Sequence, residues 1–206
     1  MKELLSRYPI LAPVRDAIGA AEAALISCFS AGGKLLLCGN GGSAADCEHI
    51  SGELCKAFLK KRPLPEEKRA EMTARQPDVL PLLDSLEGAL PAIPLPSMTA
   101  LFTAYSNDRA AELAFAQGVL ALGKPGDVLL AISTSGNSKN ILAAAKVARA
   151  IGMQVVALTG EGGGALAALS DITVAVPEGE TYKVQELHLP IYHHLCKEIE
   201  AYFFGE

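Results

Sequence analysis

A histidine and a glutamate four residues apart, His49 and Glu53, are the side chains of this chain best suited by type and spacing to chemistry. Residues at this spacing lie on one face of a helix, one turn apart. An imidazole and a carboxylate placed in this way can transfer protons as an acid/base pair, or they can bind a metal ion together. A surface hydrogen bond or ion pair is the more common outcome at this spacing, so the pair alone leaves the choice open.

A glycine-rich turn comes just before this pair. The apolar run Leu35 to Cys38 predicts a buried strand, and Gly39, Gly41 and Gly42 after it permit a tight turn and close approach to a ligand. We expect Ser43 to cap the helix that follows. Such a helix start favours anions, because free N–H groups and the positive end of the helix dipole face outward together.

Residues 39–44 also fit the loose pattern G-x-G-x-x-A of dinucleotide-binding folds. That fingerprint requires an acidic residue at the end of the next strand, about 20 residues further on. The corresponding stretch, 59–63, reads LKKRP, which is basic and unlike a strand. An NAD(P) enzyme therefore ranks well below a protein that binds a phosphate group.

A second loop of the same kind follows the apolar run Val128 to Ile132 and precedes an alanine-rich helix at 139–151. This loop carries four hydroxyl side chains within six residues: Ser133, Thr134, Ser135 and Ser138. Hydroxyl and amide groups together can bind a phosphate monoester without a dedicated cation. Helix capping alone would need fewer hydroxyls, so we favour a ligand-binding role.

Apolar runs and helical patterns alternate along the chain, which predicts an α/β fold with a parallel sheet covered on both faces. We expect strands at 35–38, 92–95, 128–132, 154–159 and 172–176, and helices at 14–31, 66–75, 97–105, 110–122, 139–151, 165–169 and 180–204. Pro190 should kink the last helix or mark where a turn is reset. Both polar loops would lie at the carboxyl edge of the sheet, where such folds bind ligands. The absence of a P-loop motif favours a phosphorylated small molecule over a nucleotide.

The segment at about 60–90 differs from the rest in its density of proline and charge. A segment of this length without a core pattern is either a functional loop, such as a lid, or a solvated surface excursion. The sequence does not separate these two possibilities.

Composition limits the class of protein. The chain has 206 residues, half of them hydrophobic, and a net charge of −5, which fits one α/β domain and gives no general affinity for nucleic acid or an anionic membrane. No apolar run approaches the roughly 20 residues of a membrane span, and no signal peptide is visible. The five cysteines are an odd number without a C-x-x-C pair. We therefore expect a soluble, cytoplasmic protein with free thiols.

Five motifs together resemble one family. They are GNGGSAAD at 39–46, HISGEL at 49–54, SND at 106–108, STSGNS at 133–138 and QELH at 185–188. Their order and spacing resemble the sugar isomerase (SIS) fold, and within it the phosphoheptose isomerases. The resemblance covers about residues 30–200 apart from the proline-rich segment. It implies a single SIS domain over 1–206: a flavodoxin-like, three-layer sandwich around a five-stranded parallel sheet, with an N-terminal helical segment at 1–31 and an insertion at about 60–90.

The resemblance also implies an activity and a set of site residues. The family interconverts sedoheptulose 7-phosphate and D-glycero-D-manno-heptose 7-phosphate, a precursor for lipopolysaccharide or other cell-surface polysaccharides. Its acid/base residues match Glu53 and His193, and the ligands of its one zinc ion per subunit match His49, Glu53, Gln185 and His193. Its substrate-binding residues match Asn40, Gly41, Gly42, Ser43, Glu53, Asn107, Asp108, Ser133, Thr134, Ser135, Ser138 and Gln185.

This chemistry agrees with the residue types. Moving a carbonyl between C1 and C2 requires a base at carbon and an acid that shuttles a proton between oxygens, through an enediol or enediolate. A divalent metal could stabilise that intermediate. Because glutamine is a poor zinc ligand, we expect the zinc to be lost readily. The family further implies a homotetramer with active sites at subunit interfaces, where first and last helices of different subunits meet.

Three features depart from the family pattern. They are the insertion, Pro190 just before His193, and Ala57 where the family has a substrate-binding arginine; Lys56, Lys60, Lys61 and Arg62 are the candidate replacements. A shifted preference for another ketose phosphate is therefore one alternative. A non-catalytic SIS-domain regulator is another, although such proteins tend to lose the Glu or the final His. His188 would orient a ligand or make a structural hydrogen bond, and His194 would be structural or interfacial.

Overall fold

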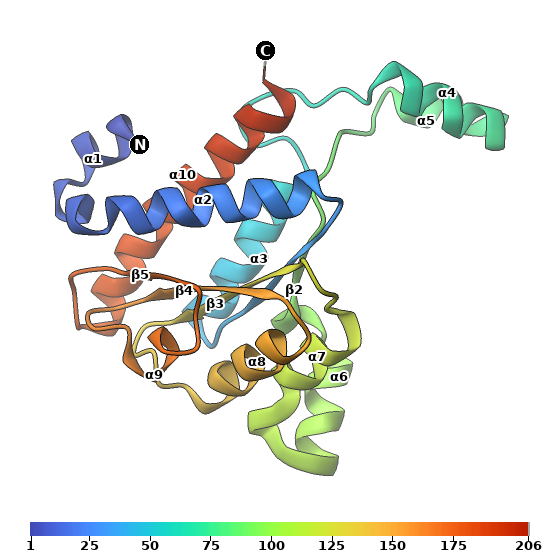
Figure 1. The fold of residues 1–206 in the computed structure, drawn as a ribbon. Coiled ribbons are helices and arrows are strands. Elements are labelled where there is room, and N and C mark those ends of the chain that lie inside the picture. Colours follow the sequence, from blue (N-terminus) through green and yellow to red (C-terminus); the bar gives the residue numbers. More distant parts are fainter. Residues whose placement is uncertain (206) are drawn as a thin grey trace.

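The computed structural model of the chain describes residues 1–205. Its centre is a five-stranded parallel sheet in the order β2-β1-β3-β4-β5 (Figure 1). The strands are β1 (Leu35–Cys38), β2 (Ala92–Pro94), β3 (Val128–Ser133), β4 (Gln154–Thr159) and β5 (Ile172–Ala175). Each lies within two residues of its predicted position, and the parallel sheet flanked by helices is confirmed.

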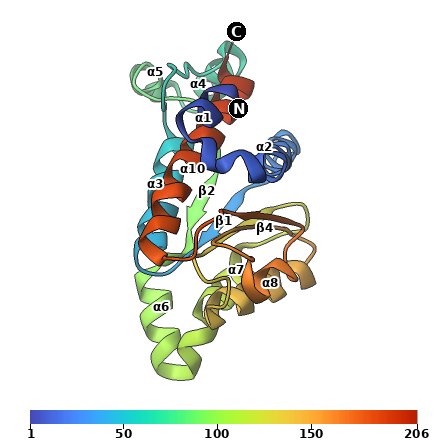
Figure 2. The same cartoon turned by 90° about the vertical axis from the view of Figure 1, so that its left-hand side faces the viewer.

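Helices cover both faces of this sheet, as Figures 1 and 2 show. One face carries α1 (Lys2–Arg7), α2 (Arg15–Ser30), α3 (Gly42–Cys55) and α10 (Thr181–Phe204). The other carries α6 (Thr99–Tyr105), α7 (Ala114–Leu122), α8 (Lys139–Ala150) and the short α9 (Gly164–Ala167). The central strands β1, β3 and β4 are apolar except for Ser133, Gln154 and Thr159 at their ends, as expected of strands buried on both faces.

The alternation of side chains along β1 divides the interior into two cores. Leu35 and Leu37 pack with α2, α3 and α10, whereas Leu36 and Cys38 pack with α7 and α8. All four residues are fully buried. The strand therefore holds the glycine turn that follows it in a fixed position relative to both layers of helices.

Two local expectations are revised. The expectation that Ser43 caps α3 was wrong: the helix begins at Gly42, Gly41 is its N-cap with φ of 56°, and no side chain caps it. A positive φ suits glycine, which has no Cβ to clash. Near the C-terminus, residues 181–204 form one helix that continues through the buried Pro190, so no turn is reset there.

The proline-rich segment projects from the body as an arm, which we define as residues 64–86 (Figure 1). It contains α4 (Glu66–Arg75), as predicted, and the single turn α5 (Leu80–Leu83). The base of the arm is closed by a bridge between Pro63 and Glu87 and by the N–H of Gly88, which donates to the Arg62 carbonyl at 2.6 Å.

Among residues 1–205, none of the helices is both long and apolar enough to cross a membrane.

Candidate active site

The two polar loops predicted from the sequence meet at one cavity of about 270 Å³. They follow β1 and β3, which are neighbours in the sheet although β2 lies between them in the chain. Ligands bind in α/β sheets at such a point, where the strand order reverses. The cavity is lined by Asn40, Gly41, Gly42, Ser43, Ile132, Ser133, Thr134, Ser138, Thr181 and Gln185.

Three helices begin at this cavity. Gly42 is the first residue of α3, Ser138 is the N-cap of α8, and Thr181 is the first residue of α10. None of these helix starts has a side-chain capping hydrogen bond. Because the first N–H groups of a helix lack intrahelical acceptors and carry the positive end of its dipole, three such ends create a favourable site for an anion.

Hydrogen bonds between side chains hold the loops together. Asn40 and Asn140 exchange two, at 3.0 and 2.8 Å, so the β1 loop is tied to the first turn of α8. The Ser133 hydroxyl donates to the Ser138 hydroxyl at 3.2 Å, which closes the β3 loop on itself. Asn140 was not anticipated from the sequence.

The His49/Glu53 pair lies further along α3. His49 Nε2 is 3.4 Å from Glu53 Oε1, as the four-residue spacing predicted. His193 of α10 faces them, with its ring centroid 5.0 Å from that of His49. Helices α3 and α10 of a single chain pack together, so one chain is sufficient to bring His49, Glu53 and His193 to one place.

His193 is half-buried, and its Nε2 has no hydrogen-bond partner in the described part of the chain. Burial, followed by the neighbouring His49, lowers the pKa of His193, while Glu53 opposes this shift. This shift favours the neutral form of the imidazole, which has a lone pair for a proton or a metal ion.

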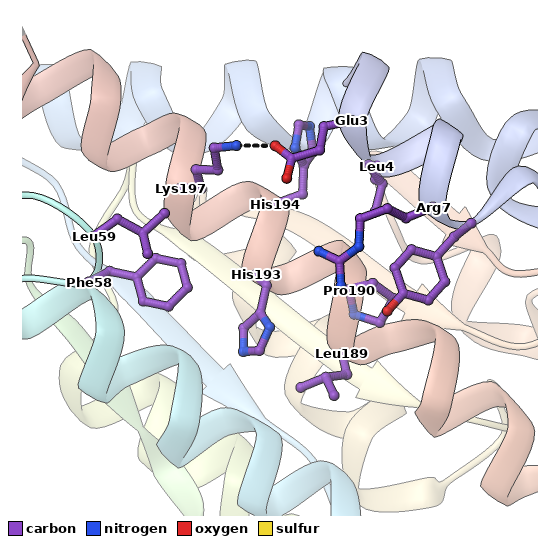
Figure 3. A pocket seen from close by; sticks show the side chains of 11 residues that line it. Glu3, Leu4, Arg7, Phe58, Leu59, Leu189, Pro190, His193, His194 and Lys197 are labelled. Carbon is purple, nitrogen blue, oxygen red and sulfur yellow. Dashed lines mark hydrogen bonds and ion pairs between the residues drawn. The ribbon is translucent and has the colours of Figure 1, made fainter.

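A second cavity, of about 520 Å³, adjoins His193 between α1, residues 58–59 and α10. Figure 3 shows His193 projecting from α10 between Phe58 and Leu189 at the wall of this space, with the Lys197–Glu3 ion pair across its upper side. The histidine is thus reachable from an open cavity and is not enclosed in the core.

Gln185 lies at the first cavity, two turns before His193 on α10. The imidazoles, the carboxylate and this amide are a donor set that zinc accepts. Within residues 1–205, however, no three His, Cys, Asp or Glu side chains are grouped closely enough to hold a metal ion by themselves. Zinc binding by His49, Glu53, Gln185 and His193 therefore remains a prediction.

Some predicted binding residues do not line the cavity. Asn107 and Asp108 lie in an exposed π-helical turn after α6, where the Asn107 amide donates to the Asp108 carboxylate at 2.9 Å. Ser135 is exposed, and its hydroxyl accepts from the Asn137 N–H. The cavity lining contains eight of the twelve predicted substrate-binding residues, and Glu53, further along α3, is the fourth that it lacks.

The basic residues after α3 have different roles from one another. Arg62 is fully buried and bonded to Glu200 and to the carbonyls of Glu53 and Leu54, so its proposed availability to substrate was wrong. Lys56 is exposed and reaches Glu53 Oε2 at 2.8 Å. It is therefore the cation placed beside the candidate base.

The two other histidines of α10 are structural. His188 is fully buried, its Nε2 lies 3.2 Å from the Thr159 carbonyl oxygen, and burial lowers its pKa to about 4. His194 is buried near Glu22 and Glu198, at 3.7 and 3.5 Å, and it lines the larger cavity next to His193.

Sequence reasoning missed two residues of the site, Tyr192 and Asp46. The Tyr192 hydroxyl donates to Asp46 Oδ1 at 3.2 Å and lies 3.1 Å from His49 Nδ1. The available signal was the position of Asp46, three residues before His49 and hence on its face of α3. Tyr192, next to His193 in an apolar stretch, looks from the sequence like a core residue.

Comparison with known proteins agrees with the geometry. The SIS domain family model matches residues 9–76 and 88–160, and so passes over the second half of the arm and Glu87. A phosphoheptose isomerase from Shewanella sp. (strain ANA-3) is 39% identical over 194 residues, covering 93% of this chain and 86% of the relative. The solved phosphoheptose isomerase from Neisseria gonorrhoeae is similar with a TM-score of 0.73 and 31% identity, covering 97% of this chain and 98% of that one.

A second solved phosphoheptose isomerase, from Francisella tularensis, gives a TM-score of 0.77 with 34% identity, covering 96% of this chain and 92% of that one. The residues matched by the family model include strands β1 to β4 and both polar loops. Sequence, fold and site together show that the chain belongs to the phosphoheptose isomerase family of SIS-domain proteins.

Proposed function

We propose that this chain is an aldose–ketose isomerase that converts sedoheptulose 7-phosphate to D-glycero-D-manno-heptose 7-phosphate. The observation that carries the proposal is the arrangement along α10. The helix begins at an anion site built from three helix starts, and further along it presents His193 to His49 and Glu53. A phosphate bound at the first place would present the far end of an extended sugar to the second.

Glu53 is the base and His193 the acid in this proposal. The carboxylate of Glu53 removes a proton from the carbon beside the carbonyl and returns it to the neighbouring carbon. The imidazole of His193 moves a proton between the two oxygens. The loops orient the sugar, and this positioning supplies part of the rate enhancement.

We also propose that the site binds one zinc ion. His49, Glu53 and His193 would hold it together with Gln185, and the buried, unpartnered Nε2 of His193 supports this choice. When bound, the ion would polarise the carbonyl oxygen and offset developing negative charge. A set without thiolates binds zinc less tightly, so we expect the metal to be removed by mild chelation.

Turnover of sedoheptulose 7-phosphate by Glu53→Gln tests the proposal. We expect kcat to fall by about 10²- to 10⁴-fold, the usual contribution of general acid–base catalysis. Glu48→Gln is the matched control, because Glu48 is an exposed carboxylate on the same helix that bonds Ser97 at 2.8 Å. Both variants are assayed after metal stripping and after zinc is restored.

The outcome separates the proposal from its rivals. Folded, zinc-supplied protein that binds the sugar phosphate without converting it would indicate a non-catalytic regulator. Conversion of a different ketose phosphate in a parallel assay would indicate a shifted substrate. Full turnover by Glu53→Gln would refute the assignment of the base.

The assembly and location proposed for the chain are a homotetramer in the cytoplasm. Membership of the family supports both, and the free cysteines suit a reducing compartment. Light scattering, with four times the 21.5 kDa chain mass as the expected result, tests the assembly.

A further inference from the structure

The Tyr192 side chain, on α10, contacts two residues of α3, Asp46 and His49. Its hydroxyl lies 3.2 Å from Asp46 Oδ1 and 3.1 Å from His49 Nδ1, and its ring meets the His49 ring edge-on with centroids 5.4 Å apart. Tyr192 is 2% exposed. The phenol oxygen is thus held in place between an acid and an imidazole, one helical turn apart on α3.

The direction of the two hydrogen bonds follows from which of the three groups can donate and which can only accept. A carboxylate can accept but not donate, so the single O–H of Tyr192 goes to Asp46. The phenol oxygen then has lone pairs for the N–H of His49 at Nδ1. The ring is therefore in its Nδ1–H form, and Nε2 keeps its lone pair.

That lone pair lies where the proposed chemistry needs it. His49 Nε2 is the nitrogen nearest Glu53, at 3.4 Å from Oε1, a separation longer than an ordinary N–H···O bond. An imidazole that binds a metal ion has its other ring N–H held by an acceptor, which fixes the tautomer and the ring orientation.

We propose that Asp46 and Tyr192 are positioning residues that hold His49 in the Nδ1–H tautomer, with Nε2 directed toward Glu53 and His193. The consequence for zinc rests on the proposed function, but the tautomer itself does not. If Tyr192 instead only filled the core and satisfied its own hydroxyl, the tautomer of His49 would not depend on it.

Nitrogen-15 NMR of the histidine rings in metal-free protein tests this directly. The spectra are recorded about two pH units above the ordinary histidine pKa of about 6.5, where a free imidazole is neutral. We expect a protonated, pyrrole-like Nδ1 and a pyridine-like Nε2 in the wild type. Tyr192→Phe should shift the ring toward the Nε2–H form or a mixture. The opposite tautomer in the wild type, or an unchanged ring in Tyr192→Phe, would overturn the proposal.

Tyr202→Phe is the matched control, since Tyr202 is on the same helix and 60% exposed. Zinc affinity is measured for all three proteins by competition with a chromogenic chelator. We expect a 10- to 100-fold loss for Tyr192→Phe, the range for removing such a supporting contact, and no change for the control. Equal affinities would refute the role toward zinc. If Tyr192→Phe does not fold, the spectrum of the wild-type protein still tests the proposal, because it shows which nitrogen of His49 carries the proton.

The two proposals fail in different ways. Absence of sedoheptulose 7-phosphate turnover by wild-type protein would refute the function and leave the tautomer as measured. Normal turnover with the Nε2–H tautomer would refute the positioning role and leave the function intact.

Discussion

At the scale of single residues, the site depends on a glycine that leaves room for a partner side chain. A Cβ on Gly42 would lie 2.5 Å from Nε2 of Gln185. Real Cβ atoms do not approach so closely, so one group must move. The end of a glutamine side chain moves more easily than the first turn of α3 does. Gly42 therefore sets the position of Gln185 at the mouth of the cavity.

Gly42→Ala should impair binding without unfolding the protein. Displacing Gln185 removes about one hydrogen bond to the ligand, worth about 0.5–1.5 kcal/mol, and so raises KM by about two- to tenfold. Gly52→Ala on the same helix is the control, because a Cβ there meets nothing within 4 Å, and alanine should stabilise α3 by about 0.5–1 kcal/mol. Steady-state kinetics and thermal melting measure both effects. A wild-type KM for Gly42→Ala would contradict this role of the glycine.

What could be predicted of individual residues depended on how local their signals are. His49 and Glu53 share one helix, and the serines after β3 follow one another, so spacing alone revealed them. Tyr192 meets Asp46 across 146 positions of sequence. That contact is set by the register of α10 against α3, which side-chain packing determines and no local pattern records.

At the scale of elements, a buried ion pair ties the end of α3 to α10. Glu200 accepts from Arg62 Nε at 2.8 Å and from the N–H groups of Phe58, Leu59 and Lys60. Arg62 in turn donates to the carbonyls of Glu53 and Leu54, which end α3. The C-terminus of the helix that carries Glu53 is thus fixed by two fully buried side chains, Arg62 and Glu200.

Glu200→Gln should destabilise the fold strongly. It leaves the fully buried Arg62 charge without its counter-ion, which typically costs about 3–5 kcal/mol. Glu186→Gln, at an exposed site on the same helix, should change the free energy of unfolding by less than about 0.5 kcal/mol. Urea unfolding measures both. If Glu200→Gln does not fold, the double variant Arg62→Met/Glu200→Leu should be more stable than it, because no buried charge is left unpaired.

The same pair predicts a dependence on pH. Burial alone would raise the pKa of Glu200, but the N–H groups of Phe58 and Leu59 and the Arg62 guanidinium outweigh it, and the pKa falls below 4.5. A carboxyl with a lowered folded pKa stabilises the protein above its unfolded pKa and loses that contribution as pH falls through the folded value. As the pH falls below about 4.5, the free energy of unfolding of the wild type should therefore decrease more steeply than that of Glu200→Gln. Parallel declines would refute this.

The elements themselves were largely predictable, and their tertiary partners were not. Apolar runs identified the strands because both faces of a parallel sheet are buried. The basic stretch 60–62 suggested contacts with substrate, but Arg62 is fully buried and donates to Glu200. Its partner Glu200 lies in the last turns of α10, and nothing in the sequence distinguishes this buried glutamate from its partly exposed neighbour Glu198.

At the scale of the whole molecule, the arm is separate from the two cores. Helix α4 contains no buried residue, and the buried Leu83 belongs to neither core. The arm starts and ends at the bridge between Pro63 and Glu87, beside the C-terminal end of α3. The anion cavity lies at the opposite end, where α3 and α10 begin. Glu53 lies close to the base of the arm, but the residues that hold this end of α3, Arg62 and Glu87, are outside residues 64–86. The arm also leaves Leu80, Leu82 and Leu86 exposed.

Replacing residues 64–86 by a linker of about four glycines and serines should therefore preserve both fold and turnover. The ends are already paired, and closing a shorter loop favours folding by an amount on the order of 1 kcal/mol. Thermal melting, kinetics and light scattering of the intact and shortened proteins measure the result. Loss of turnover with an unchanged number of subunits and an unchanged melting temperature would identify the arm as a lid. A smaller number of subunits per assembly would indicate that the leucines of the arm are buried between copies of the chain. Removing a segment that only contacts solvent would leave the number of subunits unchanged.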